Sequence, residues 1–266
     1  MENERELPEI QIEGTPFLVD VQTNMFREKA DPENELSLFY MDMREKGYGF
    51  SYDKQNKTFR TPHSSNEDCV YVRIKPLAEL DPEGLAAKYG YAVDQIKGKS
   101  DFEIMVDQQA LEKRLNGHLP TIEIAEHTFY IDYNMEMLRP KDDFLSKGIS
   151  FKELEDYSDF FDGECRFPYD PKTREIRNPD FDTITEFPKD LIVVSLPPIW
   201  QLDPVAHARV FGVDRNECLM RYGIQLEFKA EKIPWEKTGI TEDIKRNLAK
   251  KKGEKKQTNR KKGRGI

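Results

Sequence analysis

Paired aspartates are the residues of this sequence that could support acid-based chemistry. Asp20 and Asp132 each follow an apolar, strand-like segment at matching places in the two halves of the chain. Two-metal nucleases and glycosidases need carboxylates that converge in space. A hydrolase site between the halves would therefore use Asp20 and Asp132. A salt bridge to Arg27 or Arg139 would instead give each of them a structural role, and the sequence leaves both interpretations open.

Two further aspartate pairs already have a structural explanation. Asp81 and Asp203 each precede a proline, which is the pattern of a helix start, because aspartate accepts bonds from the free backbone N–H groups there. Asp53 and Asp170 open charged segments with the composition of turns. We therefore assign none of these four to catalysis.

The remaining reactive residue types show no spacing that is typical of a catalytic, metal or phosphate site. No HExxH motif, CxxC pair or GxxxxGK[ST] loop occurs in the sequence. The histidines are His63, His118, His127 and His207, and the cysteines, which suggest no disulfide framework, are Cys69, Cys165 and Cys218. The sequence thus predicts no metal site, no cofactor and no nucleophilic enzyme.

Charge is distributed very unevenly along the 266 residues. The whole chain carries a net charge of −9, whereas residues 1–244 carry −19 and residues 245–266 carry +10. Basic segments of this kind bind phosphates by releasing counterions. The cations expected to contact nucleic acid are Lys245, Arg246, Lys250, Lys251, Lys252, Lys255, Lys256, Arg260, Lys261, Lys262 and Arg264.

Three other roles for this basic segment stay open. It could fold back on the acidic part of the chain, serve as a neutral extension, or act as a nuclear address in a eukaryotic host. The segment contains no aromatic residue that could stack on bases, so we expect no sequence specificity from it alone. Thr241 has the character of a helix cap, while the residues after Leu248 are almost entirely polar, which favours a disordered or partly helical tail.

Three blocks of the sequence recur in the same order, which predicts an internal duplication. Residues 7–27 align without a gap with residues 119–139, and Phe50–Asp53 recurs as Phe167–Asp170. Residues 70–90 recur as residues 192–212. We therefore expect an α+β fold with two tandem units, at residues 1–118 and 119–235, and a tail at residues 236–266.

Each unit should consist mainly of antiparallel strands with one or two helices. Apolar alternation around Glu13–Gly14 predicts a hairpin, whose turn should differ in the second copy. The other elements expected in the first copy are a hairpin across residues 53–56, a strand at 70–74, a helix from Pro82 to Gly90, a short strand at 102–106 and a helix at 108–115.

Together these features favour a non-enzymatic binding or adaptor protein. Its duplicated body would contact a protein partner, with exposed edge strands as natural sites, and its tail would contact nucleic acid. The alternatives are the acid-based hydrolase and an acidic mimic of nucleic acid. The sequence has neither an export signal nor an apolar run of transmembrane length, so we expect no membrane contact and a cytoplasmic location, or a nuclear one in a eukaryote.

Overall fold

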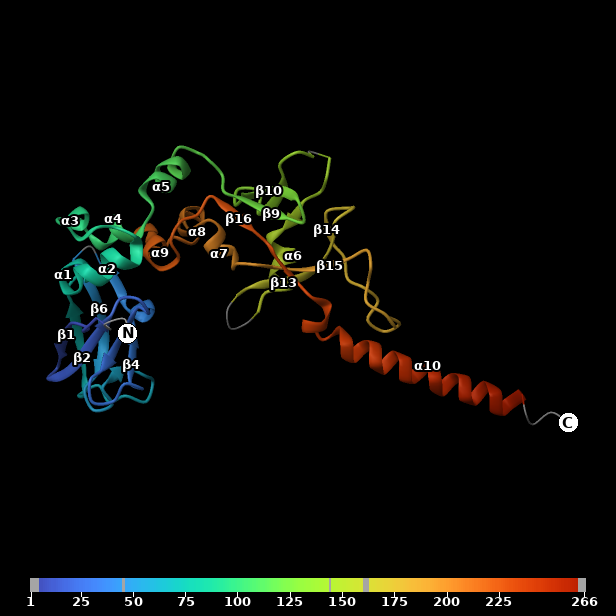
Figure 1. Ribbon diagram of the computed structural model, residues 1–266, viewed down its shortest axis with the longest axis horizontal. Coiled ribbons are helices and arrows are strands. Elements are labelled where there is room, and N and C mark those ends of the chain that lie inside the picture. Colours follow the sequence, from blue (N-terminus) through green and yellow to red (C-terminus); the bar gives the residue numbers. More distant parts are fainter. Residues whose placement is uncertain (1–4, 45, 144, 160–162, 263–266) are drawn as a thin grey trace. The chain divides into compact units, whose positions relative to one another are not determined.

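A computed structural model describes residues 5–44, 46–143, 145–159 and 163–262, without the side chains of Arg44 and of residues 253–262. The chain is mixed α/β and contains several antiparallel sheets (Figure 1). It divides into two compact units. Unit 1 contains Met1–Glu112 and Ala208–Ile224, and unit 2 contains Lys113–His207 and Gln225–Ile266.

Unit 1 begins with a sheet of four antiparallel strands in the order β1-β2-β3-β4, here called sheet A. Its strands are β1 (Glu9–Ile12), β2 (Thr15–Asp20), β3 (Met25–Glu28) and β4 (Glu35–Ser37). The predicted first hairpin is confirmed. Glu13 and Gly14 both have positive φ, which is the two-residue turn that matches the twist of paired strands.

The second sheet of unit 1, sheet B, is built around its central strand β6. The short strands β5 and β7 pair with opposite ends of β6, and β8 pairs along its full length. The bounds are β5 (Asp42–Arg44), β6 (Gly47–Asp53), β7 (Thr58–Phe59) and β8 (Cys69–Ile74). The second hairpin and the strand at 70–74 are therefore confirmed as predicted.

Sheets A and B enclose the apolar core of unit 1. Phe17 of sheet A meets Tyr52 of sheet B edge to face, with ring centroids 6.5 Å apart. Both side chains are fully buried, and along β2 and β3 buried residues alternate with half-buried ones. Burying one face of these strands fixes their pairing register, since a slip by one residue would turn the apolar side chains outward.

Helices close one end of this core. They are α1 (Leu77–Leu80), α2 (Pro82–Tyr89), α3 (Val93–Ile96), α4 (Asp101–Met105) and, from the second half of the sequence, α9 (Arg215–Tyr222). The predicted start of α2 is confirmed. The Asp81 carboxylate accepts from the Gly84 N–H at 2.9 Å and holds both terminal nitrogens of Arg5, at 2.5 and 2.6 Å.

The strand predicted at residues 102–106 is wrong, because these residues lie in α4 and just after it. Ser100 caps the helix, accepting from the Glu103 N–H, while the Glu103 carboxylate accepts from the Ser100 N–H at 2.8 Å. This reciprocal capping decides the local conformation against the strand propensity of the apolar residues. The helix predicted at 108–115 is confirmed as α5 (Gln108–Leu115).

Unit 2 opens with sheet C, whose first four strands pair as those of sheet A do. They are β9 (Thr121–Ile124), β10 (His127–Asp132), β11 (Met137–Pro140) and β12 (Ile149–Ser150). Ile122 pairs with Phe129 as Ile10 pairs with Phe17. Contrary to expectation the hairpin turn keeps the geometry of unit 1, with positive φ at Ala125 and Glu126 although neither is glycine.

The other sheet of unit 2, sheet D, contains β13 (Cys165–Asp170), β14 (Glu175–Ile176) and β15 (Ile192–Leu196). Tyr169 pairs with Ile192 as Tyr52 pairs with Val70. Two strands extend the sheets of unit 2 further. β16 (Glu227–Lys229) pairs in parallel with β9, and β17 (Glu231–Ile233) pairs antiparallel with β15. No described strand takes either place in unit 1.

The helices of unit 2 repeat the capping contact of unit 1. Sheet C leads into α6 (Phe151–Glu155), and sheet D leads into α7 (Ile199–Leu202) and α8 (Pro204–Phe211). Asp203 accepts from the Ala206 N–H at 3.0 Å and from the Nε and Nη2 atoms of Arg114, at 2.9 and 2.7 Å. The side chain of Asp203 is 1% exposed and that of Arg114 is 11% exposed, so this ion pair is buried.

A 3₁₀ turn at Trp235–Lys237 leads into the last helix, α10 (Ile240–Lys262). The helix begins one residue before the predicted cap, Thr241, and it continues far into the basic tail. Among the described residues, no helix combines the length and the apolar character needed to span a bilayer.

Replacing Asp203 with alanine should lower the free energy of unfolding of unit 2 by about 3–5 kcal/mol, because Arg114 would keep a buried charge without a partner. Urea unfolding followed by tryptophan fluorescence measures this, since Trp200 and Trp235 both belong to unit 2. In the control Asp142→Ala, whose carboxylate pairs with Arg174 and is 62% exposed, the loss should stay below about 1 kcal/mol. Equal losses would contradict the assignment.

The turn aspartate of sheet B should stay ionised in strong acid. Hydrogen bonds from the Ser64 hydroxyl and from Asn56 lower the pKa of Asp53 to about 2. Its charge therefore stabilises the fold above the ordinary aspartate pKa of about 3.9, and that contribution disappears as the pH falls towards 2. NMR titration of the carboxyl carbon should show a midpoint near pH 2, and the stability difference between wild type and Asp53→Asn should shrink below pH 4. A midpoint at or above 4 would contradict this.

Candidate functional site

Asp20 lies in the turn between β2 and β3, where it is fully engaged. Its carboxylate accepts from the N–H groups of Gln22 and Thr23, at 3.0 and 3.3 Å, and forms an ion pair with Arg27. Burial disfavours the charged form of Asp20, but the bonds from Arg27 and Thr23 outweigh it and lower the pKa. The carboxylate thus organises the turn and is neutralised by the neighbouring strand.

Asp132 makes the same contacts within unit 2. It accepts from the N–H groups of Asn134 and Met135, at 3.1 and 3.2 Å, and pairs with Arg139 at 3.3 Å. Each candidate acid therefore has the structural role that the sequence offered as the alternative to catalysis. Among the described residues no three His, Cys, Asp or Glu side chains come close enough to hold a metal ion.

His207 is the histidine that lies on a helix, as the sequence predicts. Its ring packs edge to face on Tyr133, with centroids 6.3 Å apart. Burial lowers the pKa of His207, so the imidazole is neutral at physiological pH. This packing gives the residue a structural role in unit 2.

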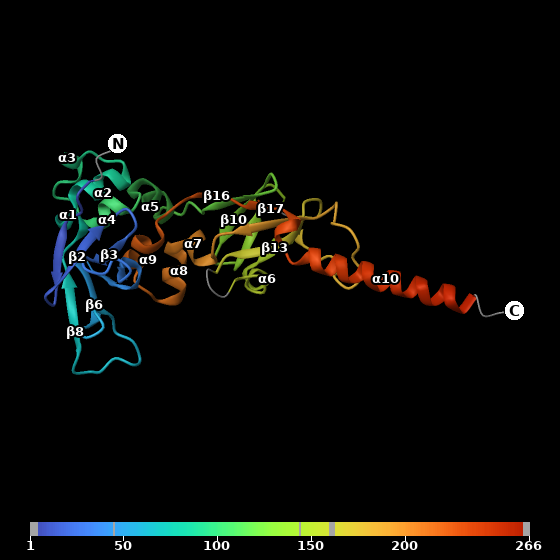
Figure 2. The ribbon, with the colours of Figure 1, turned by 60° about the horizontal axis from the view of Figure 1, so that its bottom comes forward.

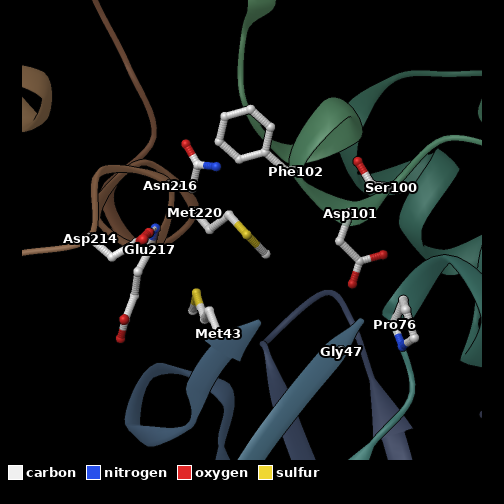
Figure 3. Close-up of a pocket in the computed structure, with 10 residues that line it drawn as sticks. All are labelled: Met43, Gly47, Pro76, Ser100, Asp101, Phe102, Asp214, Asn216, Glu217 and Met220. Atoms are coloured by element: carbon white, nitrogen blue, oxygen red, sulfur yellow. Dashed lines mark hydrogen bonds between the residues drawn. The ribbon is translucent and has the colours of Figure 1, made fainter. Parts of the chain in front are cut away.

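Unit 1 contains a cavity of about 480 Å³ beside α4 and α9 (Figure 3). Asp101 on α4 and Glu217 on α9 contribute acidic side chains to its wall, and Met43 and Met220 contribute apolar ones. None of the ten residues drawn in Figure 3 is a lysine or an arginine. The charged side chains that line the cavity are therefore acidic.

The acidic side chains that line this cavity already form hydrogen bonds or ion pairs within unit 1. Asp101 accepts from the Tyr48 hydroxyl at 2.6 Å and from the N–H groups of Leu77 and Ala78, at 2.6 and 2.8 Å. Glu217 pairs with Arg221 at 2.7 Å. The Asp101 carboxylate thus joins α4 to α1, and the Glu217 carboxylate is engaged by Arg221 within α9, so the two do not form a set of free ligands.

The described basic side chains of α10 are exposed. They are Lys245, Arg246, Lys250, Lys251 and Lys252. Lys245 and Arg246 pair with Glu242 and Asp243 in the first turns of the helix. The three consecutive lysines form no ion pair with a described residue. The side chains of Lys255, Lys256, Arg260, Lys261 and Lys262, and the whole of Arg264, lie outside the described part of the chain.

The start of α10 is anchored to unit 2. Ile240 is 2% exposed and Asn247 is 3% exposed. The Asn247 amide donates to the carbonyl oxygens of Phe181 and Ile184, both at 2.9 Å. These two residues belong to the insertion, the segment of residues 177–191 between β14 and β15, which is longer than the segment of residues 60–68 between β7 and β8. The insertion therefore holds the helix that carries the cations.

Comparison with known proteins does not extend this picture. No protein family model, no curated protein and no solved structure matches the chain. The assignment of function therefore depends on the residues themselves.

The Asn247 anchor is the part of this site that sequence reasoning missed. Because Asn247 is polar and lies three positions before a run of lysines, the sequence indicates only a solvated tail there. The one available signal was Ile240, Ile244 and Leu248 at four-residue spacing, which indicates a helix with one apolar edge.

Replacing Asn247 with alanine should release the first turns of α10, because the carbonyls of Phe181 and Ile184 lose the donor that holds the helix, at a cost of about 1 kcal/mol for each bond. Hydrogen exchange of the amides in residues 240–252 should become at least about tenfold faster. The matched control Lys251→Ala changes an exposed side chain of the same helix and should leave these rates within about twofold. Unchanged exchange in Asn247→Ala would show that the anchor does not hold the helix.

Proposed function

We propose that this protein is a non-enzymatic adaptor whose C-terminal basic helix binds nucleic acid through the phosphate backbone. The observation that supports this is the anchoring of α10 at Ile240 and Asn247 together with the exposure of Lys250, Lys251 and Lys252. The helix is thus fixed at one end and presents its cations to solvent. Phosphate contacts require exposed cations that lack an acidic partner, and these three lysines meet that condition among the described residues.

The geometry of a helix suits this task. From Asn247 to Lys262 the helix rises about 22 Å, at about 1.5 Å per residue. Repulsion by the acidic body of the chain is screened over about 8 Å in physiological salt. Most of the helix therefore lies beyond that range from its anchor. Since successive cations differ by about 100° around the axis, they follow no single face, which suits binding without base recognition.

We further propose that the body is a tandem duplication, with units at residues 1–118 and 119–235 before a tail at 236–266. Support comes from the matching registers of sheets A and C and of sheets B and D. The capping contacts of Asp81 with Arg5 and of Asp203 with Arg114 match as well. In this proposal the body binds a protein partner while the tail holds the nucleic acid.

Binding of a fluorescent duplex DNA of about 20 base pairs, measured across a salt series, tests the tail. Contacts to about six phosphates predict a log–log slope near −5, which is about a thousandfold loss of affinity between 50 and 200 mM salt. Deleting residues 250–266 should abolish this binding and preserve the anchor. A variant with the Lys and Arg residues from 250 onward changed to Gln should bind as weakly while keeping its helix.

A single-stranded RNA of equal length serves as the comparison ligand and should give a shallower slope. Binding of either nucleic acid that survives both the deletion and the Gln variant would contradict the proposal. Circular dichroism of the Gln variant verifies that the loss comes from charge and not from a lost helix.

A further inference from the structure

A strand edge that unit 2 covers is open in unit 1. In unit 2, β15 pairs with β13 on one side and with β17 on the other. In unit 1, β8 pairs with β6 in the same register, but no described strand pairs with its other side. Figure 2 shows β8 at the margin of the unit, with no labelled strand beyond it. The two units therefore differ at this edge: β17 covers it in unit 2, and no described strand covers it in unit 1.

The backbone of β8 directs hydrogen-bonding groups to this open edge. The Ser51 carbonyl accepts from the Arg60 N–H at 2.8 Å, so the polar backbone groups of Ser51 point towards β7. Tyr71 lies opposite Ser51 and therefore exchanges no bonds with it. The N–H and C=O groups of Tyr71, and by alternation those of Arg73, consequently face outward.

The equivalent residues of unit 2 show what such an edge accepts. The Pro168 carbonyl accepts from the Arg177 N–H at 3.1 Å, which by the same argument directs Val193 and Ser195 towards β17. There, Val193 lies opposite Ile233 and Ser195 lies opposite Glu231.

Exposure follows the presence of the covering strand. Val193 and Ser195 are 5% and 7% exposed, whereas Tyr71 is 51% exposed and Arg73 is exposed. Val70 and Val72 pack against the core of unit 1 and hold β8 in place. An ordered strand with an edge that no described strand covers is a template for an added strand.

We propose that the open edge of β8 binds an extended segment of a partner protein as an antiparallel strand. The segment carries an acidic residue opposite Arg73 and, two positions later, an apolar residue opposite Tyr71. Arg73 forms no ion pair with a described residue, so an opposing carboxylate gains a direct partner. This proposal rests on the protein-binding half of the proposed function and defines its surface and partner chemistry.

A partner protein fits this edge better than a second copy of the chain does. The chain's own Glu231-Lys-Ile233 has the required pattern, but residues 225–233 already pair with both β9 and β15. Phe228 and Ala230 of this segment also pack against the core of unit 2. Donating the segment to another molecule would therefore open two edges in order to close one.

The probe is a fluorescein-labelled peptide of residues 225–235, QLEFKAEKIPW, added to the full chain and followed by anisotropy. The variant Arg73→Glu should weaken its binding by about two- to fivefold, as expected for an opposing charge pair. A second peptide with Lys in place of Glu231 should show the opposite preference and bind Arg73→Glu better than wild type. The exposed residue Lys97, which directly follows α3, is changed to Glu as the charge-matched control and should alter neither affinity.

The variant Arg73→Pro tests the backbone contribution. Proline removes an outward N–H and no bond to β6, so the sheet should remain intact while peptide affinity falls at least about tenfold. An NMR spectrum of the full chain verifies the fold of unit 1 in this variant. In the wild type, added peptide should shift the amides of Tyr71 and Arg73.

Two results would overturn the proposal. One is that the peptide does not bind, or that it binds the Arg73 variants as tightly as the wild type, because the peptide would then not use this edge. The other is a dimer of the full chain, seen in sedimentation and abolished by Arg73→Pro, since a second copy would then be the occupant. These measurements contain no nucleic acid, so the edge can fail while salt-dependent binding by the tail persists, and the reverse.

Discussion

Each unit depends on an aspartate that caps a helix while an arginine holds it from the chain segment before the first strand. Asp81 with Arg5, and Asp203 with Arg114, each join the segment before the first strand to the start of a helix. A carboxylate buried to this degree requires such a partner, because desolvation would otherwise outweigh what the cap contributes. In unit 2 the arginine lies near the end of α5 and forms this buried ion pair with Asp203.

Much of the fold could be predicted because its signals are local. The alternation of apolar residues around Glu13–Gly14 spans only a few residues, and the structure has strands there. The Asp-Pro pairs at 81 and 203 are equally local, and each precedes a helix. The wrong prediction of a strand at residues 102–106 also has a local cause. The Ser100–Glu103 capping box starts a helix there, although the apolar residues favour a strand. The sequence did not predict β16 and β17, because strands of three mostly polar residues are stabilised by pairing with neighbouring strands and not by a local sequence signal.

The candidate site likewise has a part that could be predicted from the sequence and a part that could not. The cations of the tail are visible in composition, since net charge adds along a sequence whatever the fold. The role of Asn247 is not visible in composition. Its partners are backbone carbonyls more than sixty residues away in the sequence, in a segment without a recognisable sequence pattern. The sequence could offer Asp20 as a catalytic acid or as a turn residue, but only the positions of two N–H groups and of Arg27 show how it is engaged.

The two units differ in which of their strands are covered by a further strand. In unit 2, the segment that covers β9 and β15 runs directly through Trp235–Lys237 into α10, so closing the edges and anchoring the basic helix are one continuous arrangement. The first half of the sequence continues after α2 with α3, α4 and α5 and supplies no such segment, which leaves β8 open. In the functions proposed above, unit 2, where β16 and β17 cover β9 and β15, carries the basic helix, and the edge of β8 that no described strand covers in unit 1 accepts a protein strand.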